Sequence, residues 1–182
     1  MDGECVIEQT KRWIAEVVIG LNLCPFARRV FYAGTIRYTV TNAADDYILL
    51  QRLAEELLEL TAAPRSTVET TLLIHPNALT EFRDYNDFLA DADRLIHRLK
   101  LNSVVQIASF HPQYQFEGTE PDAVENYTNR SPFPMLHLLR ETSITEVASD
   151  PDVLLGIPER NIETLRKLGL TKLRQMLHKT TP

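Results

Sequence analysis

The fold is decided by the stretch Thr70-Thr71-Leu72-Leu73-Ile74-His75-Pro76. Its first five residues form a mostly apolar, partly β-branched run that is too short for a typical helix. Such a run predicts a strand that is buried on both faces and ends at the His-Pro pair. Two more strands are predicted around it: residues 35–40, which alternate and are rich in β-branched and aromatic side chains, and the apolar residues 104–110.

Two helices are predicted between these strands. Asp45 or Asp46 caps the first, which carries a row of leucines on one face and stops before Pro64. The second covers residues 79–99, with apolar residues on one face and Asp and Arg on the other. The alternation predicts an α/β fold: a small three-stranded, mostly parallel βαβαβ sheet covered by helices. A ferredoxin-like α+β arrangement with an antiparallel edge strand is the alternative.

Further helices are predicted outside this core. One spans residues 6–19 and is followed by Gly20; another opens at Pro132 or Pro134 and contains Met135 and His137. A turn is predicted at residues 151–152, then a helix from Pro158 to Gly169 and a last helix after it. At 182 residues the chain is expected to be one domain, covering residues 1–182. Its parts are an N-terminal helix with a Cys-Pro segment (1–34), an α/β core with a loop (35–141) and a C-terminal helical extension (142–182).

The composition restricts the function classes. A formal net charge of -6 disfavours a non-specific binder of nucleic acid or of an anionic membrane, although the chain is locally basic after Glu159. The first residues lack the basic flank of a signal peptide, and the longest apolar run is too short to span a bilayer. We therefore expect a cytoplasmic protein that does not bind membranes, with Cys5 and Cys24 as free thiols. The oligomeric state is not predicted.

The loop after the third strand is the candidate site. It begins at His111 and runs to residue 133, which is long for a loop without a function. His75 follows the strand 70–74 in the same way, because both histidines precede a proline and then a side-chain amide. If the two strands are parallel neighbours, both histidines emerge at the same edge of the sheet, where ligands bind in open sheets.

A small anionic ligand is predicted at the end of this loop. Asn126, Asn129, Arg130 and Ser131 precede the helix expected from residue 132, and a helix N-terminus attracts a phosphate or carboxylate. Arg140 would share a helix face with the histidine three residues before it. Alternatively, the serine only caps that helix while the two asparagines tie the loop to itself.

Catalytic chemistry is assigned to His111, His137 and Cys24. The two histidines offer a general acid and base, or, together with His75, ligands for a divalent metal, with Cys24 or Glu141 as the fourth ligand. No short-range metal-binding motif is present. Capping of a short helix that starts at Pro25 would lower the pKa of the Cys24 thiol and make it a nucleophile, whereas a small buried thiol is the structural alternative.

Several longer blocks resemble a known family. They are GLNLCPFA (20–27), ASFHPQYQF (108–116) and ENYTNRSPFPMLHLLRE (125–141), together with NDFL (86–89) and IPERN (157–161). These blocks are similar to an uncharacterised bacterial domain-of-unknown-function family, number fourteen-fifteen, over most of the chain. The resemblance implies a stand-alone bacterial cytosolic domain. It implies no catalytic residue, since the family has no established activity.

Two functions from different classes remain. The first is a small cytoplasmic enzyme that acts on an anionic small molecule through His, Arg and Asn side chains, with a metal as an optional cofactor. The second is a module without catalytic activity that binds a ligand or a protein partner through the same loop. A nucleic-acid accessory protein that uses the basic C-terminal part is a third and weaker alternative.

Overall fold

A four-stranded mixed sheet lies at the centre of the computed structural model, which describes residues 2–147 and 156–180. The strand order is β1-β2-β4-β3. The pair β1 (Ile36–Val40) and β2 (Thr70–Ile74) is parallel, whereas β4 (Met135–Arg140) runs antiparallel to both β2 and β3 (Val105–Phe110). The prediction of an α/β domain is therefore confirmed, and the prediction of a three-stranded, mostly parallel sheet is wrong.

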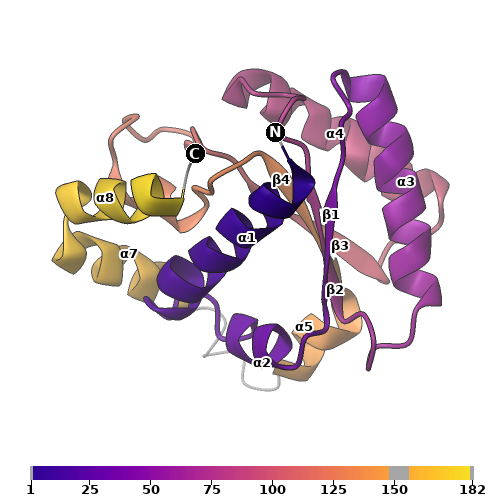
Figure 1. The fold of residues 1–182 in the computed structure, drawn as a ribbon, viewed down its shortest axis with the longest axis horizontal. Helices are drawn as coiled ribbons and strands as arrows, with labels where there is room; N and C mark the ends of the chain where they lie inside the picture. The colour runs from indigo at the N-terminus through magenta and orange to yellow at the C-terminus, as the bar shows by residue number, and fades with distance from the viewer. Residues whose placement is uncertain (1, 148–155, 181–182) are drawn as a thin grey trace.

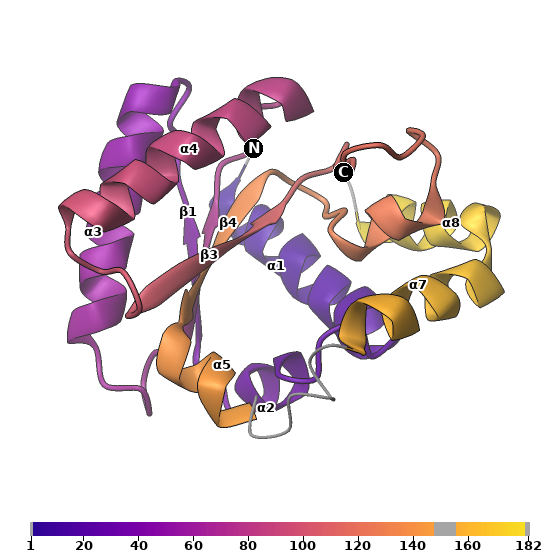
Figure 2. The same ribbon diagram turned by 180° about the vertical axis from the view of Figure 1, so that it is seen from behind.

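Helices cover both faces of the sheet (Figure 1). Two long helices pack on one face, and the N-terminal helices pack on the other, where the last two helices lie outside them. Figure 2 shows the same layers from behind. The elements of the first layer are α3 (Asp46–Ala62) and α4 (Phe82–Arg98). Those on the other side are α1 (Gly3–Trp13), η1 (Ile14–Ile19), α2 (Ala27–Tyr32), α7 (Ile157–Leu168) and α8 (Leu170–Thr180). The short helix α5 (Glu141–Val147) follows β4 directly, and the 3₁₀ helix η2 (Val124–Thr128) lies within the long loop.

The strand β2 divides the core into two apolar clusters. Leu73 packs with the leucines of α3, while Leu72 and Ile74 pack with Trp13 and the N-terminal helices. All five residues of β2 are buried, as the sequence predicted. The cap of α3 is also confirmed, because the Asp45 carboxylate accepts a hydrogen bond from the Ile48 backbone N–H at 2.8 Å.

The helix predicted from residue 132 is wrong, because residues 135–140 form β4. A short apolar run of this length fits a buried strand and a buried helix equally well. Pro132 and Pro134 disfavour helical backbone in the residues before them and leave the chain extended as it enters the sheet. β4 lies between β2 and β3. The antiparallel edge of the ferredoxin-like alternative is present, because the edge strand β3 pairs antiparallel with β4.

The terminal helices agree with the expected segments. The helix predicted over residues 6–19 is formed by α1 and the π-helical turn η1, and α7 ends at Gly169, whose φ of 82° suits glycine. The turn predicted at residues 151–152 lies outside the described residues. Among the helices that are described, none has both the length and the apolar character needed to cross a membrane.

Gly20 is expected to be intolerant of a side chain. A Cβ atom built on Gly20 would lie 2.2 Å from the Glu16 carbonyl oxygen, because the π-helical turn brings this carbonyl against the glycine. We expect Gly20→Ala to lower the free energy of unfolding by about 2 kcal/mol, measured by urea denaturation. Gly3→Ala is the matched control, because its Cβ would meet only Val40 Cβ, at an ordinary 3.9 Å. Equal stability of the two variants would contradict the prediction.

Candidate functional site: a cavity beside His137

The candidate site is a cavity of about 230 Å³ between the sheet and the N-terminal helices, called the inner cavity here. Its walls are mostly apolar side chains of η1, α2 and the sheet. His137 of β4 and Thr70 of β2 line it from the sheet. Its lining also includes the exposed residues Arg29 and Gln106, so the cavity reaches the surface of the molecule.

Two hydrogen bonds fix the tautomer of His137. The Thr70 hydroxyl lies 2.6 Å from the Leu138 carbonyl oxygen and 2.7 Å from His137 Nε2. A carbonyl oxygen only accepts, so the single hydroxyl proton is donated to it and the hydroxyl oxygen accepts from His137 Nε2–H. The nitrogen without a proton is therefore Nδ1. This atom has no hydrogen-bond partner among the described residues, and its lone pair is available to a molecule in the cavity.

The imidazole of His137 is neutral at physiological pH. Burial lowers its pKa from 6.5 to about 4, since the apolar surroundings disfavour the charged form. Ala108 lies opposite His137 in the β3–β4 pair, and its small side chain leaves space beside the ring. His137 thus offers an uncharged acceptor in an apolar space, which is suited to a base or to the recognition of a donor group.

Two buried donors of the cavity walls also lack partners. Trp13 Nε1–H and Arg140 Nε–H have no acceptor within the described parts of the chain. Buried polar groups are nearly always hydrogen-bonded, so such atoms in a cavity wall indicate a place for a bound molecule or water. The ring of Trp13 packs edge-on against Phe110 with the centroids 5.4 Å apart. The two donors come from different elements, Trp13 from α1 and Arg140 from the end of β4.

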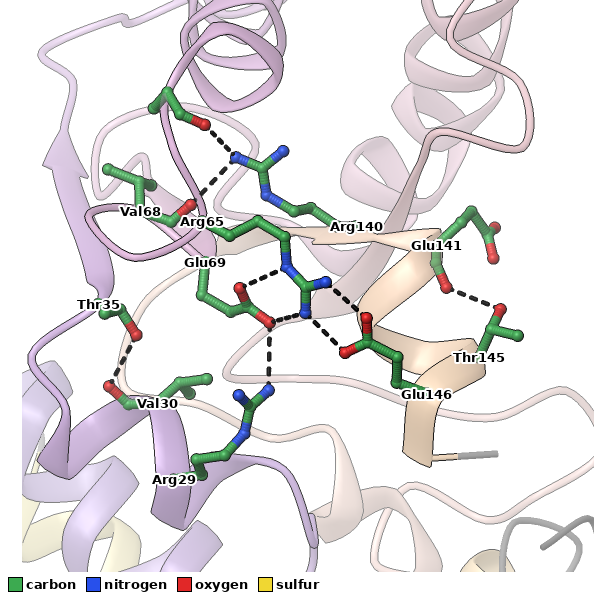
Figure 3. A network of polar contacts seen from close by, with 11 residues as sticks. Arg29, Val30, Thr35, Arg65, Val68, Glu69, Arg140, Glu141, Thr145 and Glu146 are labelled. Atoms are coloured by element: carbon green, nitrogen blue, oxygen red, sulfur yellow. Dashed lines mark hydrogen bonds and ion pairs between the residues drawn. The ribbon is translucent and has the colours of Figure 1, made fainter. Parts of the chain in front are cut away.

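A network of Arg and Glu side chains lies near Arg140 (Figure 3), and two of its members, Arg29 and Glu69, line the inner cavity. The buried Glu69 carboxylate accepts from Arg65 at 2.8 Å and from Arg29 at 3.1 Å. Arg65 also pairs with Glu146 of α5. The hydrogen bond from Arg65 is the main reason why the pKa of Glu69 falls to about 2. Sequence reasoning did not find this network, whose members Arg29, Arg65, Glu69 and Glu146 come from three separate segments.

Arg140 has a structural task in addition to facing the cavity. Its guanidinium donates to the backbone carbonyls of Leu60 and Ala63 at the end of α3, and to Val68 before β2. A cation at a helix C-terminus satisfies carbonyls that have no partner inside the helix. Burial lowers the pKa of Arg140. The side chain is therefore held in place by protein contacts, and its Nε–H has no hydrogen-bond acceptor among the described residues.

The chain matches a family model over nearly its whole length. The model, described as Protein of unknown function (DUF1415), covers residues 5–175. The chain belongs to this family. No curated protein and no solved structure matches it. The inner cavity therefore has to be interpreted from the geometry of this DUF1415 domain alone.

Cys24 of this DUF1415 chain lies at the entrance of α2, not at its cap. The helix starts at Ala27 with Phe26 as its N-cap, and the Cys24 thiol lines the inner cavity. Burial raises the pKa of this thiol, although the backbone N–H groups of Phe26 and Ala27 act in the opposite direction. The expected lowering of its pKa is therefore wrong. Cys5 and Cys24 are both free thiols, as predicted.

His75 and His111 lie together on the other face of the sheet from His137. They follow β2 and β3 and pack on either side of Tyr85 of α4, with ring centroids 5.8 and 5.1 Å from the tyrosine ring. The prediction that they share one edge is confirmed, although β4 separates the two strands. Both nitrogens of His111 bond to backbone, since Nε2 donates to Leu79 O and Nδ1 accepts from Gln113 N.

The three predicted metal ligands are not assembled into one site. Nowhere in residues 2–147 and 156–180 does a group of three or more His, Cys, Asp or Glu side chains have an arrangement that could hold a metal ion. His75, directly after β2, donates from Nδ1 to the Ala78 carbonyl at 3.0 Å, and its buried Nε2 has no partner among the described residues. His137 is directed into the inner cavity, on the opposite face. Glu141 begins α5, after the strand.

The loop residues expected to bind an anion hold the loop together instead. Asn126 accepts from Phe116 N and Thr119 Oγ1 and donates to Glu120 O, and Asn129 donates to Ser109 O. Arg130 donates to Tyr114 O and Pro121 O and stacks over the Tyr127 ring, 4.4 Å from its centroid. Ser131 donates to Phe133 O. The helix N-terminus proposed for the anion is absent, because residue 135 starts a strand.

The sequence identified three residues that line the inner cavity, His137, Cys24 and Arg140, but missed others around the histidine. Trp13, Thr70 and Glu69 were assigned no functional role, because an isolated Trp in a helix and a Thr or Glu at the start of a strand are common in protein cores. Only the tertiary structure brings them together.

Proposed function

We propose that the inner cavity binds a small cytoplasmic metabolite with an apolar body and one carboxylate or phosphate group, and that His137 acts on it as a general base. The observation that carries this proposal is the unpartnered Nδ1 of His137 in an apolar cavity. The two free thiols of the chain suit the reducing cytoplasm.

The size and lining of the inner cavity support a small apolar body. Its volume of about 230 Å³ exceeds the roughly 150 Å³ of an engineered apolar cavity that holds benzene. Leu72, Ala108 and Phe110 provide apolar contacts near the histidine. An apolar pocket with a few polar groups is typical of a small-molecule binding site.

The charges at one end of the cavity support an anionic group on that ligand. Arg29, Arg140 and Glu69 line this end of the cavity, which leaves one net positive charge there, while Arg65 pairs with both Glu69 and Glu146. Arg29 is exposed and uses only Nη2 in its contact with Glu69. A carboxylate or phosphate can therefore be bound by Arg29 and by the Nε–H of Arg140. In this proposal the anion lies here and not at the 111–133 loop.

An anionic ligand would also activate the base. The pKa of free His137, about 4, makes it a weak base, whereas general bases work best with a pKa near the working pH. A negative charge in the apolar cavity stabilises the imidazolium and raises this pKa. The proton would come from a donor group of the ligand, or from a water beside it, at Nδ1. Thr70 keeps the ring oriented through Nε2 during this transfer.

The low pKa of His137 also favours a second candidate, which is a binding module without catalysis. In that case Nδ1 only accepts a hydrogen bond from the ligand and remains neutral throughout. Both candidates predict binding in the inner cavity, and they differ in turnover.

His137→Gln tests the proposal. The Gln side chain keeps an N–H donor for Thr70 but removes the acceptor at Nδ1. We expect turnover, found by screening small carboxylic acids and phosphate esters, to fall about a hundredfold, the usual contribution of a general base. Fluorescence of Trp13, the single tryptophan, reports whether the variant still binds the same compound.

His97→Gln is the matched control, because His97 is an exposed residue at the end of α4. Full activity of His137→Gln, with unchanged binding, contradicts the role of the base. Binding without turnover in the wild-type chain supports the second candidate. If no compound in the screen changes the Trp13 fluorescence, the ligand class is wrong.

A further inference from the structure

A second cavity, called the outer cavity here, adjoins the inner one. It has a volume of about 590 Å³ and lies between η2 of the long loop and the first turns of α7. The two cavities share Val18, Cys24 and Phe110 in their walls. The helix α7 packs on η2, so the side walls of the outer cavity are regular elements that contact each other.

Hydrogen-bond donors in the wall of the outer cavity are already used by the protein. Thr119 donates to Phe116 O and Asn126 Oδ1, Thr128 donates to Glu125 O and Asn129 Oδ1, and the Asn129 amide donates to Ser109 O. These side chains therefore offer little to a ligand.

Two acceptors remain. Asn161, which is 7 % exposed, donates from Nδ2 to the Leu23 carbonyl at 2.8 Å, while its Oδ1 is buried without a partner in the described structure. The carboxylate of Glu125 likewise has no hydrogen bond or ion pair with any described residue. The polar atoms still available in this cavity are thus a carboxylate and an amide oxygen, and neither can serve an anion.

The remaining walls are apolar and partly aromatic. Phe110 and Phe116 line the cavity together with Leu23 and Ile162. Aromatic faces attract organic cations, and acceptor atoms in an apolar cavity favour groups that bring several N–H donors. This lining differs from that of the inner cavity, whose unpartnered wall donors suit an anion.

We propose that the outer cavity is a binding site for an organic ammonium group on an aromatic or aliphatic body. The ammonium donates to the Glu125 carboxylate and to Asn161 Oδ1, and its apolar part packs on Phe110 and Phe116. The site does not depend on the function proposed for the inner cavity. A neutral molecule of the same shape lacks the charge and two of the three donors, so it binds less tightly.

Benzylammonium chloride is the probe, and benzyl alcohol is its neutral counterpart. Binding of each to the full chain is followed by NMR titration of the backbone amide signals, including those of residues 125 and 161. We expect benzylammonium to bind at least roughly tenfold more tightly, which is the effect of one hydrogen bond to a charged group. Glu125→Gln should remove this preference, because it keeps the shape of the side chain and removes its charge.

Three variants complete the test. Glu117→Gln makes the same change at an exposed position of the same loop and should have no effect. Asn161→Asp loses the hydrogen bond to the Leu23 carbonyl but adds a charge at the buried acceptor, so the folded variant should bind benzylammonium more tightly, a gain that a purely structural role does not produce. His137→Gln should leave benzylammonium binding at the outer cavity unchanged, which distinguishes this site from the inner cavity. Equal binding of the two probes, or retention of the preference in Glu125→Gln, overturns the proposal.

Discussion

Acidification from pH 6.5 to pH 4 is expected to lower the free energy of unfolding by about 5 kcal/mol, with His75 and His137 responsible for most of the loss. Burial lowers the pKa values of His75 and His137 from 6.5 to about 4. Between these values the unfolded chain binds two protons that the folded chain does not bind, so stability falls as the pH falls. Each shift is equivalent to about 3 kcal/mol.

Stability falls as the pH falls because the folded protein keeps each imidazole ring neutral to a lower pH than the unfolded chain does. Above pH 6.5 both histidines are neutral in the folded and unfolded states, and the stability is complete. Below about pH 4 both states are protonated and this loss stops. A domain of this kind has a total stability of about 5–15 kcal/mol, so the loss is sufficient to unfold a marginal one. Glu69, with a pKa of about 2, adds a separate loss at lower pH.

Urea denaturation at pH 7 and at intermediate acidic pH measures this loss. His75→Asn keeps a donor for the Ala78 carbonyl, and His137→Gln keeps the one for Thr70, but neither replacement titrates. Each variant should therefore lose about half of the pH dependence. If the wild-type chain is equally stable at pH 7 and pH 4.5, the histidines are not held neutral and the assignment fails.

Tyr85→Phe is expected to lower the free energy of unfolding by about 3 kcal/mol. The buried Tyr85 hydroxyl donates to Met135 O at 2.9 Å and accepts from Phe110 N at 3.0 Å, so it joins α4 to the end of β3 and the start of β4. The variant leaves a buried N–H without an acceptor and a carbonyl with one donor fewer. Each such group costs about 1–3 kcal/mol.

Tyr38→Phe is the control for this variant. Tyr38 lies on β1, and its hydroxyl makes no hydrogen bond within the described structure. Its loss should change the free energy of unfolding by less than about 0.5 kcal/mol. Urea denaturation of both variants decides the matter. A Tyr85→Phe protein as stable as Tyr38→Phe would show that the hydroxyl does not connect the sheet to α4.

Local patterns were sufficient for the strands 36–40, 70–74 and 105–110 and for the two helices between them. Each of these segments is either apolar throughout or amphipathic with a clear period, and caps such as Asp45 mark their ends. The prediction for residues 135–140 was wrong because His137 and Arg140 interrupt the apolar residues, whose spacing then matches neither a helix nor a strand. Pairing with β2 and β3 determines the conformation of this segment. Tertiary context outweighs local propensity in such cases.

The candidate site was less predictable for a related reason. The sequence grouped His111 with His137, but His111 packs against Tyr85 of α4, whereas His137 lines the inner cavity on the other face of the sheet. The loop asparagines bind backbone groups at close range, which was the alternative considered for them. The tautomer of His137 depends on Thr70, 67 residues away, and no local pattern indicates that contact.

The position of β4 has a consequence for synthesis of the chain. Until residues 135–140 have left the ribosome, β2 and β3 each have an open edge on the side that β4 later occupies. Unpaired strand edges promote association with other chains. Hydrogen bonds of Asn126 and Arg130 within the loop bring the end of β3 close to the start of β4. This lowers the entropic cost of pairing β4 within the same chain, and so favours that pairing over pairing with a neighbouring nascent chain.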